Sequence, residues 1–160
     1  MAYGDIYTLR HTAAVSTAIT LAQIHAGAAV PVEILEASIT AVAPTSASLL
    51  LIPAFIRKST GATVTAAVLG THLFENQGAG APDPSVQLGT SGTGVVASAE
   101  GVNTDVFQPA GMHPLSGGWS WVRIADGQLI IPGGGKMGLT LLQAPTNLTY
   151  YWSITFKELG

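Results

Sequence analysis

Charged side chains are scarce in this sequence. Asp, Glu, Lys and Arg make up 9% of its 160 residues, whereas an ordinary soluble domain carries about 25%. A monomer of this length fits one domain and exposes roughly 7,500 Å² of surface. Six bases and nine acids then give about one charge per 500 Å², too few for a surface that faces only water. The shortage predicts that much of the exterior is covered by further copies of the chain or by a larger assembly.

Other absences narrow the classes of protein. Cysteine is absent, which excludes disulfides, thiolate catalysis and cysteine zinc sites and mildly favours assembly in a reducing cytoplasm. A net charge of −3 without a polybasic patch makes nucleic acid a poor partner. Two stretches without formal charge, 11–32 and 37–56, contain Pro, Thr and Ser, so we expect no membrane span. The first seven residues lack the basic and apolar regions of a signal peptide.

Catalytic motifs are missing as well. Residues 89–94 are rich in Gly but lack the Gly-Lys-Ser/Thr ending of a phosphate-binding loop. Glu33 and Glu36 would point to opposite faces of a strand, which weakens an acid–base pair. No His-x-His pair or carboxylate at ligand spacing accompanies the four histidines, His11, His25, His72 and His113. We therefore predict a protein that is not an enzyme and needs no metal or cofactor.

The closing stretch, 148–158, has the most distinct pattern in the chain. With a period of two, one face carries Leu148, Tyr150, Trp152, Ile154 and Phe156. The alternate positions are mostly polar, as in a strand with one buried face. Aromatic and β-branched residues suit such a surface. We predict an interior strand of a sheet, with burial of the five side chains worth roughly 8–15 kcal/mol before entropy is counted.

Shorter strand patterns fill most of the remaining chain. Turn residues at 58–61 and at Asp126-Gly127 predict hairpins, and 32–42 is expected to be a strand with a bulge between its two glutamates, a short helix being the alternative. The longest irregular stretch, 70–94, is the natural place for contacts with a neighbour. The other expected strands are 15–22, 49–57, 62–69, 95–99, 102–107, 118–124, 128–131 and 137–143.

These patterns predict about eight to ten short strands and no long amphipathic helix. They are typical of a single-domain, all-β antiparallel sandwich or barrel. We expect the β domain at residues 13–160 and an N-terminal docking arm at residues 1–12, with a first edge strand as the alternative for the arm.

The aromatic residues allow two interpretations. Trp119, Trp121, Tyr150 and Trp152 fill the core, which we favour, or form a platform for sugar rings. Trp119 and Trp121 also share a strand face with Arg123, and Trp and Arg are enriched at subunit interfaces. The candidate interface residues are Tyr3, Ile6, Tyr7, Arg10, His72, Phe74, Trp119, Trp121 and Arg123.

Four segments carry a resemblance to a known family. They are VEILEASIT (32–40), FIRKSTG (55–61), GGWSW (117–121) and YYWSITFKELG (150–160), in that order after a short N-terminal segment. Together they resemble the small jelly-roll decoration, or cement, proteins of tailed bacteriophage capsids. The resemblance spans nearly the full length, although the chain has no long, extended N-terminal arm.

The resemblance implies a jelly-roll, TNF-like β-sandwich that forms a homotrimer. Such a trimer would bind the major capsid protein lattice on the outer surface of the virion and stabilise the head. The family is defined by surfaces, so no site residues carry over. The alternative function is a carbohydrate-binding β-sandwich of a phage fibre or lectin-like module.

Overall fold

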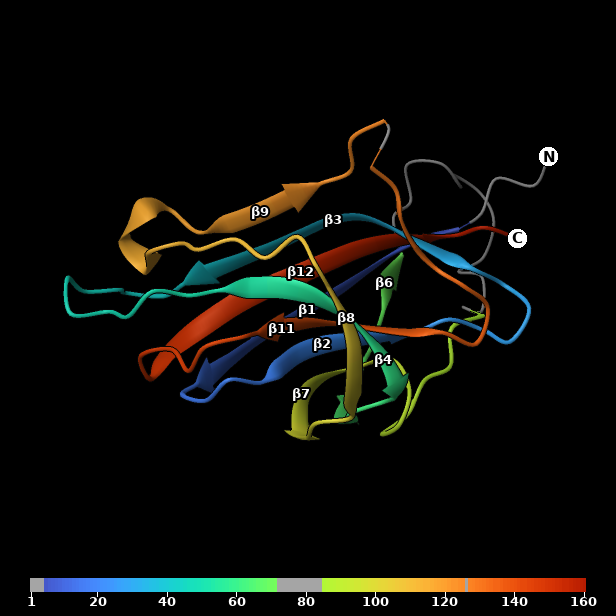
Figure 1. Ribbon diagram of the computed structural model, residues 1–160, viewed down its shortest axis with the longest axis horizontal. Helices are drawn as coiled ribbons and strands as arrows, with labels where there is room; N and C mark the ends of the chain where they lie inside the picture. The colour runs from blue at the N-terminus through green and yellow to red at the C-terminus, as the bar shows by residue number, and fades with distance from the viewer. Residues whose placement is uncertain (1–4, 72–84, 126) are drawn as a thin grey trace.

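A computed structural model describes residues 5–71, 85–125 and 127–160. Within these ranges the chain forms twelve strands and one short 3-10 helix (Figure 1). No described helix has the length and apolar character needed to cross a membrane. The elements are β1 (Ile6–Val15), β2 (Thr20–His25), β3 (Val32–Ala41), β4 (Pro53–Thr60), β5 (Thr63–Ala66), β6 (Gly70–Thr71), β7 (Gly94–Ala99), β8 (Val102–Phe107), η1 (Pro114–Ser116), β9 (Trp119–Val122), β10 (Leu129–Ile131), β11 (Lys136–Leu141) and β12 (Leu148–Glu158).

The strands form two antiparallel sheets in a jelly-roll order. Sheet A runs β10-β3-β12-β1-β6, and β9 pairs with the other half of β3. Sheet B runs β5-β7-β2-β11-β4-β8. In both sheets early and late strands alternate, because each long connection returns a strand beside the first ones, as in two Greek keys. The predicted all-β sandwich is confirmed.

Strand β12 is the centre of sheet A, as predicted. It pairs with β1 on one side and β3 on the other. Tyr150, Trp152 and Phe156 are fully buried between the sheets. Tyr7 of β1 stacks on Phe156 with ring centroids 5.7 Å apart. The first and last strands therefore close the core together, and the polar alternate face of β12 lies outward.

Strand β1 occupies most of the stretch expected as an N-terminal arm, in agreement with the strand alternative. This strand continues through residue 12 and pairs with β12 from Ile6 to Val15. Its inward residues Tyr7 and Leu9 are fully buried. The alternation was hard to recognise in the sequence because Thr8, on the outward face, is buried too and hydrogen-bonds Thr155. Of the arm, residues 1–4 lie outside the described residues.

One expected strand and two expected hairpins are wrong, because the chain turns at other places than the sequence predicts. Residues 15–22 are not one strand, because β1 ends at Val15 and β2 begins at Thr20. No Gly or Pro marks the turn between them in the sequence. Residues 58–61 form no hairpin, because β4 continues to Thr60 and β5 pairs with β7 instead. The segments around Asp126-Gly127 do not pair with each other either, since β9 and β10 both pair with β3.

The expected bulge in β3 is present and changes the position of its glutamates. The register of β3 against β12 shifts where Leu35 is inserted. Glu33 then lies opposite Lys157 and Glu36 opposite Thr155, which puts both glutamates on the outer face of sheet A. Their expected placement on opposite faces is therefore wrong, because one extra residue reverses the alternation.

Sheet B curls so that it encloses a second buried region. Only Gly61 and Ala62 separate β4 from β5, and only Glu100 and Gly101 separate β7 from β8. The paired strands β5 and β7 therefore bend away from β4 and β8, and β7 returns to pair with β2. At Gly101 a Cβ atom would collide with the carbonyl oxygen of Thr60. The bend consequently requires a residue without a side chain at that point.

Candidate functional site

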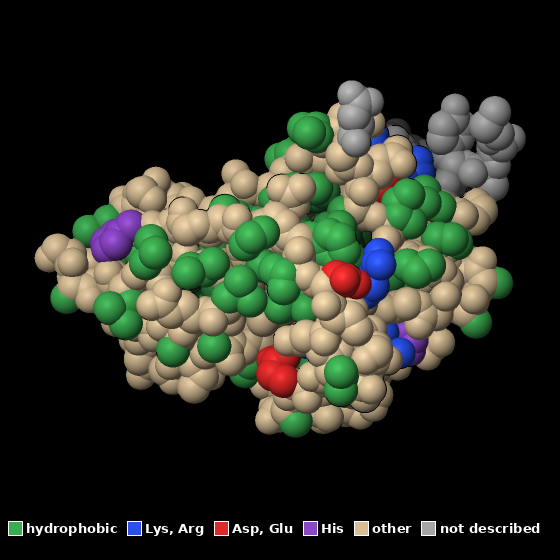
Figure 2. Space-filling view, viewed as in Figure 1, with side chains coloured by type: hydrophobic (Ala, Val, Ile, Leu, Met, Phe, Trp, Pro, Cys, Tyr) green, Lys and Arg blue, Asp and Glu red, His purple; other side chains and the backbone are tan. Residues whose placement is uncertain are grey.

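One end of the sandwich carries no formal charge. The loops 16–19, 42–52, 108–118 and 142–147 join strands at the end opposite both chain termini (Figure 1). These four loops contain no Asp, Glu, Lys or Arg and a single histidine, His113. In Figure 2 the projecting left end of the molecule likewise shows no Asp, Glu, Lys or Arg side chain, only a histidine. We call these four loops the charge-free end.

Hydrogen bonds between the loops fix the charge-free end. Leu51 and Met112 form a two-way backbone bridge with N···O distances of 2.8 and 2.9 Å. The backbone N–H of Leu49 donates to the hydroxyl of Thr146 at 2.6 Å, and the Tyr150 hydroxyl donates to the Thr146 carbonyl at 2.9 Å. Burial raises the pKa of Tyr150, which keeps that hydroxyl a donor. The loops thus satisfy much of their polar backbone among themselves.

His113 has a structural role in this end. Its Nδ1 accepts the backbone N–H of Leu115 at 3.2 Å and caps η1. Its carbonyl accepts the Ser116 hydroxyl at 2.6 Å. The short helix therefore holds Leu115 at the surface, where this side chain is 53% exposed.

The outward side chains of the charge-free end are aliphatic. The exposed ones are Val42, Leu49, Leu50, Leu115 and Leu142. Leu50 lies beside Gly111 of the neighbouring loop, where a Cβ would be 3.7 Å from the leucine. Single exposed aliphatic residues are ordinary, but a group of them on internally bonded loops is typical of a binding surface. Such a surface suits an uncharged partner, since it offers no ion pair.

Most of the predicted interface residues lie elsewhere and are not brought together. Trp119 is 7% exposed and packs against Phe55 of the opposite sheet, with ring centroids 5.9 Å apart. Trp121 meets the same ring edge-on at 5.2 Å. Trp119 therefore lies in the core, and Trp121 is half-buried against it. Tyr7 is buried against Phe156.

The remaining candidates are divided between the outer face of sheet A and the undescribed part of the chain. Arg10 is exposed on β1, and Ile6, at the start of that strand, is half-buried. Arg123 pairs with Glu33 on the outer face, with Nη1 to Oε1 at 2.8 Å. Tyr3, His72 and Phe74 lie outside the described residues. A continuous interface through these residues is not formed by the described part.

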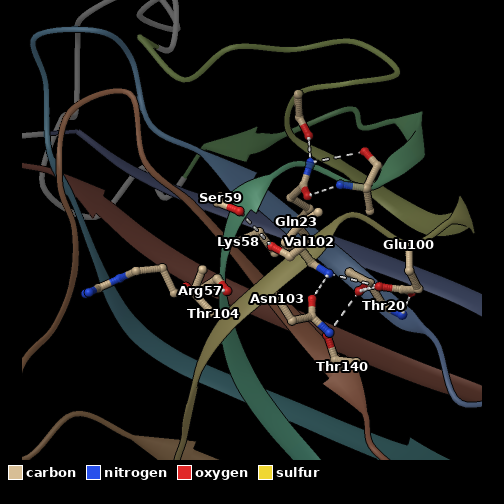
Figure 3. A network of polar contacts seen from close by, with 12 residues as sticks. Thr20, Gln23, Arg57, Lys58, Ser59, Glu100, Val102, Asn103, Thr104 and Thr140 are labelled. Atoms are coloured by element: carbon tan, nitrogen blue, oxygen red, sulfur yellow. Dashed lines mark hydrogen bonds and ion pairs between the residues drawn. The ribbon is translucent and has the colours of Figure 1, made fainter.

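A second feature of the molecule, which is polar, lies in the region that sheet B encloses. Thr20, Lys58, Glu100, Asn103 and Thr140, the Lys58 cluster, contact one another over the outer faces of β2, β11 and β4 (Figure 3). The Lys58 side chain is fully buried, whereas that of Glu100 is 36% exposed. Desolvation, the largest effect, raises the pKa of Glu100, but hydrogen bonds from Thr20 and Lys58 outweigh it and lower the pKa overall. Glu100 is therefore ionised at neutral pH.

Gln23 completes this enclosed region beside the cluster. Its side chain is fully buried. Its Nε2 donates to the carbonyl of Gly92 at 2.7 Å, and its Oε1 accepts the backbone N–H of Ala62 at 2.8 Å. Gly61 allows the close approach, because a Cβ there would lie 3.2 Å from Gln23 Nε2. One amide side chain thus ties β2 to both turns that cover it.

Comparisons with known proteins give no relative. No protein-family model, no curated protein and no solved structure matches the chain. In the part of the chain that the structure covers, no three His, Asp or Glu side chains gather as metal ligands do. The arrangement of surface and buried groups is therefore the basis for a proposal about function.

Of the two features, only the charge-free end has a signal in the sequence. The four longest stretches without formal charge are 11–32, 37–56, 106–122 and 137–156, and each contains one loop of the charge-free end. For two of them, 11–32 and 37–56, the sequence predicts only that they do not span a membrane. The residues of the Lys58 cluster are far apart in sequence, and nothing in their spacing indicates that they meet.

Proposed function

We propose that the chain is a structural virion protein, a decoration protein that binds the major capsid protein lattice of a tailed-phage head. In this proposal the protein forms a homotrimer on the outer capsid surface and stabilises the shell. The observation that supports it is the separation of charge: the Asp, Glu, Lys and Arg side chains of the described residues lie away from one end, whose hydrogen-bonded loops carry exposed aliphatic residues. We assign that charge-free end to the contact with the shell.

The physical argument is that an uncharged, preformed surface loses little on burial. Binding at this end desolvates no ionised side chain, so it avoids the large free-energy cost of desolvating an unpaired charge. The hydrogen-bonded loops are already ordered, which reduces the entropy lost on binding. Three such ends on one trimer would bind a repeating lattice with much greater avidity than one copy.

A glycan-binding function has less support. Trp119 and Trp152 are buried, and Trp121 packs edge-on against Phe55. Of these three rings only Trp121 keeps some exposure, and one half-buried ring does not form the expected platform. No described feature therefore favours the alternative.

Two measurements test the proposal. Light scattering is expected to give a particle of three times the chain mass of 16.3 kDa. Cosedimentation with tailed-phage capsids assembled without their decoration protein is expected to show saturable binding. A soluble monomer that binds none of these shells would overturn the proposal.

Three substitutions test whether the charge-free end is the contact with the shell. Leu49→Asp and Leu115→Asp place carboxylates on the charge-free end and are expected to weaken binding by about tenfold or more, because a buried unpaired charge costs more than about 1.4 kcal/mol. The matched control is Val122→Asp, at an aliphatic side chain of sheet A that is 61% exposed. It should bind normally. Equal losses in all three variants would show that the charge-free end is not the contact.

A further inference from the structure

The amine of Lys58 lies between a carboxylate and a carboxamide. Its Nζ is 2.9 Å from Oε2 of Glu100 and 2.7 Å from Oδ1 of Asn103 (Figure 3). Lys58 and Asn103 face each other across the ladder between β4 and β8. The amine is thus held at the oxygen of the carboxamide, and the amide carbon is one bond farther away.

The carboxylate is oriented by groups other than Lys58. Oε2 of Glu100 accepts the Thr20 hydroxyl at 2.6 Å, and its Oε1 accepts the Thr20 backbone N–H. The Thr20 hydroxyl oxygen lies 3.0 Å from that of Thr140 and can accept its proton. Glu100 therefore has a fixed position from which it can take a proton from Lys58. An adjacent base is what converts a lysine into a nucleophile.

We propose that Lys58 and Asn103 join in an intramolecular isopeptide bond, with Glu100 transferring the protons. Glu100 takes a proton from the ammonium group, and the neutral Nζ attacks the amide carbon of Asn103. Glu100 returns the proton to the amide nitrogen, and the tetrahedral intermediate collapses with loss of ammonia. Glu100 then takes the second excess proton from Nζ and passes it to the departing ammonia, which is released as ammonium. One C–N bond forms, one C–N bond breaks, and the carboxylate is regenerated. No oxidant, metal or cofactor is required.

The surroundings favour this condensation in two ways. The fully buried amine is kept beside a single carboxamide, and such fixed proximity is equivalent to a high effective concentration of the two reacting groups. Asn103 itself is exposed, so the ammonia has a direct route to solvent. Its departure makes the reaction effectively irreversible.

The bond would strengthen an exposed edge strand of sheet B. Strand β8 is at the sheet edge, and five of its six residues are exposed. Its register against β4 is irregular on both sides of Lys58. A covalent link there would prevent this edge from separating, whichever partner the protein has. The inference is independent of the proposed capsid role.

Intact-protein mass spectrometry of the purified chain is the test. Loss of one ammonia lowers the mass by about 17 Da, and digestion should yield one branched peptide that contains both Lys58 and Asn103. The Glu100→Gln and Lys58→Arg variants are each expected to keep the full mass calculated from their sequences. The wild-type chain kept in denaturant from the start of purification should keep its full mass too.

The variants also distinguish the proposal from a succinimide. Cyclisation of Asn103 onto its own backbone likewise releases ammonia but does not need Lys58. A loss that persists in Lys58→Arg, or a wild-type chain that retains its full mass after days at neutral pH, would overturn the proposal. Because the wild-type mass decides the matter, the test does not depend on how well a variant folds.

Discussion

The molecule has two buried regions that are built from different chemistry. Between the sheets, Trp152, Tyr7, Tyr150, Phe55 and Phe156 form an apolar core that is closed to solvent. On the outer face of sheet B, the Lys58 cluster and Gln23 are covered by the bend into β5 and β7. Close packing of apolar side chains stabilises the first region, and directed hydrogen bonds stabilise the second. Substitutions in the two regions should therefore destabilise the protein for different reasons.

The energetics of the two regions explain this difference. An apolar side chain gains free energy in proportion to the area that it buries, so truncation costs that area and the cavity left behind. A buried polar group gains little net free energy from its hydrogen bonds, but costs much more when its partner is removed. In the apolar core the size of the lost side chain should decide the effect. In the Lys58 cluster the decisive factor should be which group remains without a partner.

The largest expected effect is at Trp152. We predict that Trp152→Ala lowers the free energy of unfolding by about 3–5 kcal/mol, since the side chain is fully buried at the centre of sheet A. Denaturant unfolding followed by tryptophan fluorescence and circular dichroism measures it. The matched control is Tyr151→Ala on the same strand, where the side chain is 38% exposed; we expect a change of about 0.5 kcal/mol. Similar losses at both positions would contradict the placement of β12.

The next largest effect is at Glu100. Glu100→Gln removes the carboxylate from beside a fully buried amine, and we expect a loss of about 2–3 kcal/mol, reduced from the usual range because Glu100 is partly exposed. Adding Lys58→Met removes the stranded amine and should restore about half of that loss. Chemical unfolding of the single and double variants measures the difference.

The comparison between these two variants does not depend on the isopeptide bond, because neither can form it as proposed. If the double variant is no more stable than Glu100→Gln, the buried amine does not need the carboxylate, and the contrast between the two buried regions is lost.

The two regions also differ in how far the sequence predicts them. The apolar core follows from local alternation, and the predicted burial of Trp152 and its neighbours on β12 is confirmed. The Lys58 cluster depends on how sheet B bends at residues 61–62 and 100–101, where paired strands separate and a new pairing begins. Turn residues at 58–61 predicted a hairpin, because glycine marks a sharp bend as well as a reversal. Pairing between distant strands decides which of the two occurs, and one local segment does not contain that information.

The charge-free end was only partly predictable for the same reason. The scarcity of charge predicts a covered exterior, which stays a prediction, and the location of the charge-free end depends on how the jelly-roll connects its strands. Leu49 and Leu50 illustrate the limit. They belong to a dense apolar run that predicts a buried strand, yet β4 begins only at Pro53 and both leucines remain exposed. A proline at the start of the strand fixes its boundary, since it cannot donate to the ladder.

The smallest expected effect is a pH dependence at His25, at the margin of the polar region. Desolvation, followed by the nearby charge of Lys136, lowers the pKa of His25 below 6.5 in the folded chain, although backbone contacts with Gly134 and Ser91 oppose this. Below pH 6.5 the unfolded chain therefore takes up a proton that the folded chain does not, and stability falls with falling pH. The slope cannot exceed about 1.4 kcal/mol per pH unit for one proton. Unfolding measured from pH 7.5 to 5 should show this decline, and His25→Gln should flatten it. An unchanged slope in His25→Gln would assign the decline to other groups and leave the polar region without a part in the acid response.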